Sequence, residues 1–217
     1  MNLLFDLDGT LTDPGVGITR CIQHALASLG GIVPPSGDLL RFVGPPLRGT
    51  FEKLLDTNHP EGIDEAIRLY RSRFASVGIF ENEVYPDVPP ALSELHDGGH
   101  RLWVVTSKPH VYARRITDHF ELTKLFEGIY GSELSGENAE KADLIRIVVG
   151  REGLATQDTC MIGDRAQDIF GAHANGVASV AALWGYGSVE ELRAANPDWM
   201  AASMNDLRSW VCRPTRC

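Results

Sequence analysis

The sequence predicts an α/β protein, in which a Rossmann-like core with a parallel sheet carries an inserted α-helical cap. Apolar runs that are too short for a helix and suit buried strands recur along the chain. They lie at residues 3–5, 102–105, 128–130, 160–162 and 178–182. Amphipathic stretches separate several of these runs, as where Leu144, Ile145 and Val148 share one helical face. Strands that alternate with helices predict a parallel sheet covered on both faces.

One long region breaks this alternation. Residues 13–83 show helical periodicity and almost no strand signal, and their first apolar face repeats at helical spacing from Ile18 to Leu29 before Gly30 and Gly31 stop it. The region could simply be the long first crossover of the sheet. It is far longer than a crossover requires, however. We therefore expect a separate helical insert, the cap, at 13–83, within a Rossmann-like core formed by 1–12 and 84–217.

Composition limits the classes of partner. The 217 residues are 43% apolar and 23% charged, with a net charge of −9, which indicates a globular chain and disfavours binding to a nucleic-acid polymer. No apolar run is long enough for a membrane span, and the first residues do not resemble a signal peptide. The cysteines form no Cys-x-x-Cys pair, which favours a reduced, cytoplasmic location. The negative charge does not exclude a small phosphorylated metabolite, which needs only one local cationic pocket, and nothing in the sequence predicts an oligomeric state.

Polar residues follow the apolar runs, at the points where the strands are expected to end. In doubly wound sheets, ligands bind beyond the carboxyl ends of the strands. The residues at these points are Asp6 and Asp8 after the first run, Thr106 and Ser107 after the second, Asp164 and Asp168 after the fourth, and Lys141 at the start of the helix before that fourth run. We expect these side chains to meet at one edge of the sheet.

This set of side chains suits phosphoryl transfer through a covalent intermediate. A carboxylate nucleophile can accept the phosphoryl group as an aspartyl phosphate, which divides one difficult displacement into two easier ones. Attack by an anion on a dianion needs positive charge, so Mg²⁺ is the expected cofactor and Lys141 would add a fixed charge. Thr106, and backbone amides where Ser107 and Pro109 open a helix, would hold the phosphate. Asp8 can exchange protons with the leaving alcohol and the attacking water.

Each element also has a purely structural interpretation. The alternatives are a hairpin turn at Asp8 and Gly9, a helix cap at Thr106 and Ser107, favourable charges at a helix N-terminus for Asp164 and Asp168, and a solvated surface lysine for Lys141. What favours the catalytic interpretation is that all the elements occur together, in order, each at a predicted strand end or helix start.

These motifs together resemble the haloacid dehalogenase superfamily, and the match covers nearly the whole chain. The matching residues are Asp6, Asp8, Thr10, Leu11 and Thr12 of the first motif, Thr106, Lys141, and Gly163, Asp164 and Asp168 of the last. The resemblance implies that Asp6 is the nucleophile and a Mg²⁺ ligand, and that Asp8 is the general acid and base and offers its carbonyl to the metal. It also implies that Asp164 binds the metal, and that Asp168 either binds the metal itself or contacts a group that does. Thr106 and Lys141 would bind the phosphoryl group.

Secondary motifs are similar to phosphoglycolate-phosphatase-like hydrolases, and to a bacterial branch described as 5′-nucleotidases. These motifs lie at 44–47, 106–109, 130–134 and 163–165. The resemblance implies a Mg²⁺-dependent phosphatase for nucleoside 5′-monophosphates, with phosphoglycolate as the alternative substrate. A sugar phosphomutase also stays open, whereas Asp8 argues against a dehalogenase and the intact set of catalytic residues argues against a regulatory module without turnover. In the cap, Gly44, Arg48 and Arg20 are candidates for substrate contact.

Overall fold

Six parallel strands form the main sheet of the computed structural model, which describes residues 1–212. Within these residues the strand order is β5-β4-β1-β6-β7-β8. The strands are β1 (Asn2–Phe5), β4 (Arg101–Pro109), β5 (Gly128–Ser132), β6 (Thr159–Gly163), β7 (Ala178–Ala182) and β8 (Trp199–Ala201). The predicted α/β parallel sheet is therefore confirmed, with the short β8 added at one edge.

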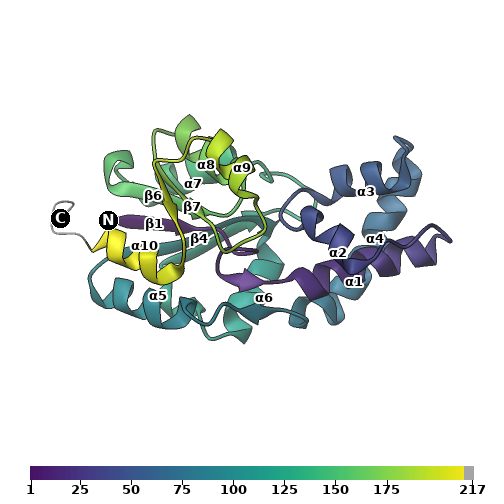
Figure 1. Cartoon of the computed structure of the whole chain (residues 1–217), viewed down its shortest axis with the longest axis horizontal. Helices are drawn as coiled ribbons and strands as arrows, with labels where there is room; N and C mark the ends of the chain where they lie inside the picture. The colour runs from purple at the N-terminus through teal and green to yellow at the C-terminus, as the bar shows by residue number, and fades with distance from the viewer. Residues whose placement is uncertain (213–217) are drawn as a thin grey trace. The chain divides into compact units, whose positions relative to one another are not determined.

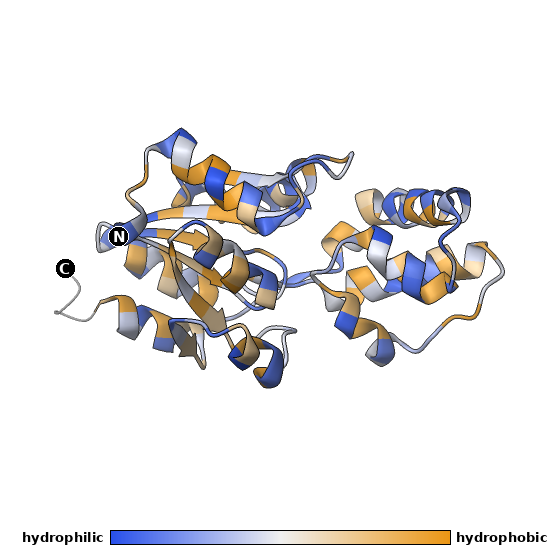
Figure 2. Cartoon of the chain, turned by 90° about the horizontal axis from the view of Figure 1, so that it is seen from above, coloured by the Kyte–Doolittle hydropathy of each residue, from blue (hydrophilic) through white to orange (hydrophobic). Residues whose placement is uncertain are grey.

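Helices cover both faces of this sheet (Figure 1). One face carries α7 (Lys141–Glu152), α8 (Ala166–Ala174) and α9 (Val189–Ala194), and the other carries α5 (Val88–Asp97), α6 (His110–His119) and α10 (Met204–Val211). Single 3₁₀ turns lie at Thr123–Leu125 and Thr156–Asp158. The strands are mostly apolar in Figure 2, because both of their faces are buried under helices. Within residues 1–212, no helix has the length and apolar character needed to cross a membrane.

The register of the central strands determines where the segments after β1, β4 and β6 begin. Leu4 on β1 lies opposite Trp103 on β4 and Met161 on β6, and all three are fully buried in one apolar cluster. Just beyond the strand, the backbone N–H of Asp6 donates to the carbonyl of Ile162 at 2.9 Å. The chain segments that follow β1, β4 and β6 therefore start from the same edge of the sheet.

The chain forms two compact units, one made of Met1–Thr12 with the chain from Val84 onward, the other of Asp13–Glu83. The second unit is helical and contains α1 (Gly15–Ser28), α2 (Ser36–Leu39), α3 (Leu47–Leu55) and α4 (Pro60–Ser76), with 3₁₀ turns at Leu40–Phe42 and Gly78–Phe80. The strands β2 (Thr12–Asp13) and β3 (Glu83–Val84) pair where the chain passes between the units. On α1 the expected apolar face is buried as far as Leu26, but Leu29 is exposed because it lies beyond the last helical residue.

Candidate active site

Asp6 stands at the end of β1, in a tight loop. Its Oδ1 accepts the backbone N–H of Leu7 at 2.8 Å, and the carbonyl of Leu7 in turn accepts the N–H groups of Leu11 and Thr12. Gly9 has a φ of +83°, and a Cβ atom there would clash with the carboxylate of Asp164. Glycine is thus required in this loop both for its left-handed backbone and for the close approach of Asp164.

Lys141 is the cationic centre of the site. Its Nζ lies 3.0 Å from Oδ1 of Asp6 and 2.8 Å from Oδ1 of Asp168, and it donates to the carbonyl of Val105 at 2.9 Å. The side chain is only 3% exposed. Desolvation lowers the pKa of Lys141, but the two carboxylates outweigh it and hold the pKa above its ordinary value. Lys141 is therefore a buried, charged group in contact with the expected nucleophile, and the surface-lysine alternative is wrong.

Asp6, Asp164 and Asp168 form a buried acidic cluster. One carboxylate oxygen from each lies within 4.8 Å of the others. Burial, followed by the charges of Asp168 and Asp6, raises the pKa of Asp164 to about 8. Burial also raises the pKa of Asp168 to about 6, although Lys141 opposes the rise.

A divalent cation fits this cluster. The charged groups brought together at this edge are the carboxylates of Asp6, Asp8, Asp164 and Asp168 and the ammonium groups of Lys108 and Lys141. When all four carboxylates are ionised, they exceed the two ammonium groups by two negative charges in a buried region. Oxygen ligands are those that Mg²⁺ prefers, and its positive charge would lower the pKa of Asp164 by stabilising the ionised carboxylate.

Asp8 is held by a lysine to which the sequence analysis assigned no role. Nζ of Lys108 lies 2.6 Å from Oδ2 of Asp8, and both side chains are nearly buried. Burial raises the pKa of Asp8, and Lys108 opposes that rise. Its spacing from Thr106 could have identified Lys108 as a site residue. Residues two apart in a strand face the same side, and Thr106 is a candidate site residue. The apolar run ends at Val105, so the strand was not expected to continue to Pro109.

Thr106 and Ser107 lie on the last part of β4. Thr106 is buried, and its Oγ1 accepts the backbone N–H of Lys108 at 3.3 Å. The hydroxyl of Ser107 donates to the carbonyl of Ala139 at 2.7 Å, so it ties β4 to the segment just before Lys141. The expected helix start is confirmed at Pro109, which is the N-cap residue of α6, and is wrong for Ser107. The strand continues to Pro109 through a register irregularity, and the helix begins at His110.

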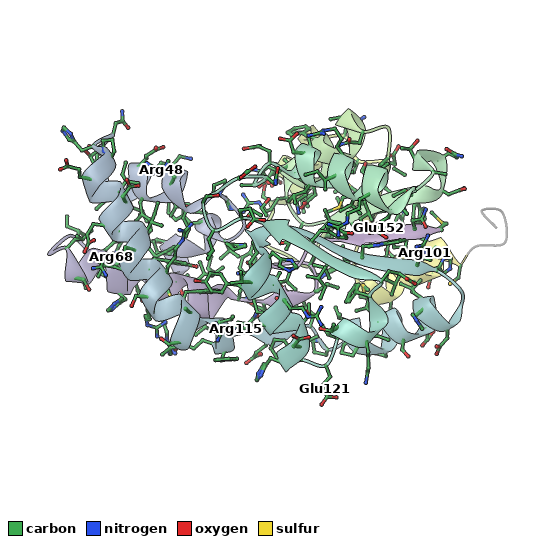
Figure 3. All side chains as sticks on the ribbon, turned by 180° about the vertical axis from the view of Figure 1, so that it is seen from behind. Arg48, Arg68, Arg101, Arg115, Glu121 and Glu152 are labelled. Atoms are coloured by element: carbon green, nitrogen blue, oxygen red, sulfur yellow. The ribbon has the colours of Figure 1, made fainter. Side chains whose placement is uncertain are left out.

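The cap candidates lie in the helical unit. Arg20, on α1, donates to Glu81 at 2.7 Å, and Arg48, on α3, is paired with Asp64. Figure 3 labels Arg48 among the side chains of this unit. Both arginine side chains are more than half exposed. Gly44 has a φ of +100° in the turn before α3.

The comparisons identify the family. Residues 3–182 match the haloacid dehalogenase-like hydrolases. The chain belongs to this family. This haloacid dehalogenase-like hydrolase is 46% identical over 207 residues to a 5′-nucleotidase of Pseudomonas aeruginosa, covering 95% of this chain and 93% of that protein. It is a phosphoric monoester hydrolase.

Other relatives of this haloacid dehalogenase-like hydrolase carry different names. It is 34% identical over 208 residues to the tyrosine-protein kinase PtkA of Mycobacterium tuberculosis, covering 95% of this chain and 70% of that protein. At 27% identity it matches a phosphoglycolate phosphatase of Aquifex aeolicus, over 94% of this chain and 93% of that protein. A crystal structure of a predicted phosphatase from Clostridium acetobutylicum has a TM-score of 0.92 and 38% identity, covering 97% of both chains.

Proposed function

We propose that this enzyme hydrolyses small phosphomonoesters in a Mg²⁺-dependent reaction, through an aspartyl phosphate on Asp6. One observation carries the proposal: Asp6 contacts Lys141 and is also a member of the acidic cluster with Asp164 and Asp168. A carboxylate placed between a buried cation and a candidate metal site suits a nucleophile that must approach a phosphate dianion. When held by Asp6, Asp164, Asp168 and the carbonyl of Asp8, Mg²⁺ would supply charge that neutralises the transferring group.

In the first step, a carboxylate oxygen of Asp6 forms a bond to phosphorus while the ester P–O bond breaks. Asp8 gives a proton to the leaving oxygen, which departs as the alcohol. In the second step, Asp8 takes a proton from water as the water attacks phosphorus, and Asp6 leaves as a free carboxylate. Lys141 holds Asp6 in orientation throughout. Lys141, Thr106 and the backbone near Ser107 are the proposed phosphate-binding groups.

We propose a nucleoside 5′-monophosphate as the substrate. We also propose that the enzyme acts in the cytoplasm. The support for the substrate is the 46% identity to a 5′-nucleotidase over nearly the whole chain, and the support for the location is the absence of paired cysteine motifs in the sequence. Phosphoglycolate is the second candidate substrate, because relatives with that activity in their name match at lower identity. A sugar phosphomutase on the same scaffold is the third.

A phosphate-release screen tests the proposal. Nucleoside monophosphates, phosphoglycolate and sugar phosphates are compared by kcat/KM with Mg²⁺ and again with EDTA. We expect the highest kcat/KM with a nucleoside 5′-monophosphate and no turnover in EDTA. A higher value with phosphoglycolate, or an isomerised sugar phosphate formed without free phosphate, would replace the proposed substrate. Full turnover in EDTA would remove the metal from the mechanism. Labelling of a tyrosine peptide by ATP, without phosphate release from any monophosphate, would favour kinase activity instead.

We also propose that Gly44, Arg20 and Arg48 contact the substrate beyond its phosphate. The support is that both arginines are charged side chains of the helical unit, and both are more than half exposed although each forms an ion pair. Arg20→Ala and Arg48→Ala should raise KM for a nucleoside monophosphate and leave KM for p-nitrophenyl phosphate unchanged. Arg68→Ala, which removes an exposed arginine paired within α4, is the matched control. Equal KM values for all three variants would refute the assignment.

A further inference from the structure

The loop that follows β7 reaches back to the first catalytic loop, although the two are far apart in the sequence. The indole Nε1 of Trp184 donates to the backbone carbonyl of Thr10 at 2.9 Å. The hydroxyl of Thr10 then donates to Oδ1 of Asp164 at 3.1 Å. Two successive hydrogen bonds thus connect the indole ring to one oxygen of a candidate metal ligand.

The same loop contacts the other oxygen of that ligand. The backbone N–H of Tyr186 donates to Oδ2 of Asp164 at 2.8 Å. Between Trp184 and Tyr186, a Cβ atom on Gly185 would clash with Asp164 and with the carbonyl of Gly9. Only a residue without a side chain allows the loop to lie this close to the carboxylate.

We propose that Trp184 is a positioning residue for the metal ligand Asp164, acting through Thr10, and this inference rests on the Mg²⁺-dependent function proposed above. Asp164 is 1% exposed and its carboxylate is flanked by other acidic groups, so its orientation depends on the donors that hold it. Partners that orient a metal ligand commonly contribute a factor of about 10 to 100 in metal affinity. The Thr10 backbone is held from two sides, by the indole of Trp184 on its carbonyl and by the carbonyl of Leu7 on its N–H.

Mg²⁺ titration of the whole protein by isothermal calorimetry tests the proposal. Trp184→Phe keeps an aromatic ring and removes the N–H, so the Kd for Mg²⁺ should rise about tenfold. The thermal midpoint in EDTA should stay near the wild-type value, which a merely structural loss would not allow. Trp199→Phe is the matched control, because Trp199 lies on β8 and stacks on Trp210; its Kd should be unchanged.

A double-mutant cycle with Thr10→Val shows whether Trp184 acts through Thr10. We expect Trp184→Phe to weaken Mg²⁺ binding little further in a Thr10→Val background, because coupled residues are not additive. If Trp184→Phe fails to fold, Trp184→Leu removes the same N–H and should also raise the Kd. A wild-type Kd in a folded Trp184 variant would overturn this inference and leave the proposed function standing. Absence of Mg²⁺ binding by the wild-type protein would overturn both the inference and the metal dependence of the proposed function.

Discussion

Nζ of Lys108 lies 2.6 Å from Oδ2 of Asp8, with the two side chains only 6% and 10% exposed. The pair joins the end of β4 to the loop after β1, two segments about a hundred residues apart. A buried ion pair is a poor source of stability, but removal of one partner leaves the other charge buried and unpaired. The position of the expected general acid and base therefore depends on a lysine from a different strand.

Substitution of Lys108 should impair catalysis and also lower stability, because Asp8 is left buried without its partner. In Lys108→Met the carboxylate of Asp8 loses the ammonium group that positions it, and we expect kcat/KM for an alkyl phosphate to fall about 10- to 100-fold. The loss should be smaller for p-nitrophenyl phosphate, whose leaving group needs little proton donation. Lys124→Met, at an exposed position, is the control. Equal losses for both substrates would contradict a role through Asp8.

Asp6→Asn should abolish turnover in a folded protein. The amide has nearly the shape of the carboxylate and can still accept a hydrogen bond from Lys141, but it is a poor nucleophile. We expect kcat to fall by about 10³-fold or more, with an unchanged thermal midpoint in EDTA. Phosphate release and thermal denaturation measure the two effects. Turnover within tenfold of wild type would show that another group attacks phosphorus.

The metal-free protein should lose stability as the pH rises. The pKa of Asp164 is about 8 in the folded chain and that of Asp168 about 6, both above the ordinary value of an aspartate. Between about pH 4 and about pH 8, the unfolded chain has therefore released protons that the folded chain still holds, so the free energy of unfolding decreases with increasing pH. Thermal denaturation in EDTA measures this slope.

Two comparisons check the cause of that slope. Asp164→Asn should flatten it, because the amide does not titrate. Excess Mg²⁺ should raise the thermal midpoint most at high pH, where the ligands bind metal as carboxylates. A midpoint in EDTA that rises steadily between about pH 5 and about pH 8, in the wild-type protein, would contradict the raised pKa values.

Gly9→Ala should remove Mg²⁺ binding through a steric clash with Asp164. Gly99→Ala is a matched control, because Gly99 has a φ of +80°, close to the +83° of Gly9, and nothing lies within 4 Å of its Cβ position. Both variants should lose about 1–2 kcal/mol of stability from left-handed alanine, and Gly9→Ala should lose more because of the clash. Only Gly9→Ala should weaken Mg²⁺ binding, by at least about tenfold. Equal Mg²⁺ affinity in the two variants, by calorimetry, would refute the steric argument.

The sequence by itself determined the parallel α/β sheet and the residues at its functional edge. Apolar runs and helical spacing are local patterns, and the carboxyl ends of parallel strands meet at one edge, so Asp6, Thr106 and Asp164 could be located without coordinates. Only the tertiary structure decided which groups touch. Several contacts join segments that no sequence periodicity relates. They are the ion pairs of Lys108 and Lys141, the hydrogen bond from Ser107 to Ala139, and the hydrogen bond from Trp184 to Thr10. Such contacts depend on strand register and on the paths of the loops, which the packing of the whole sheet determines.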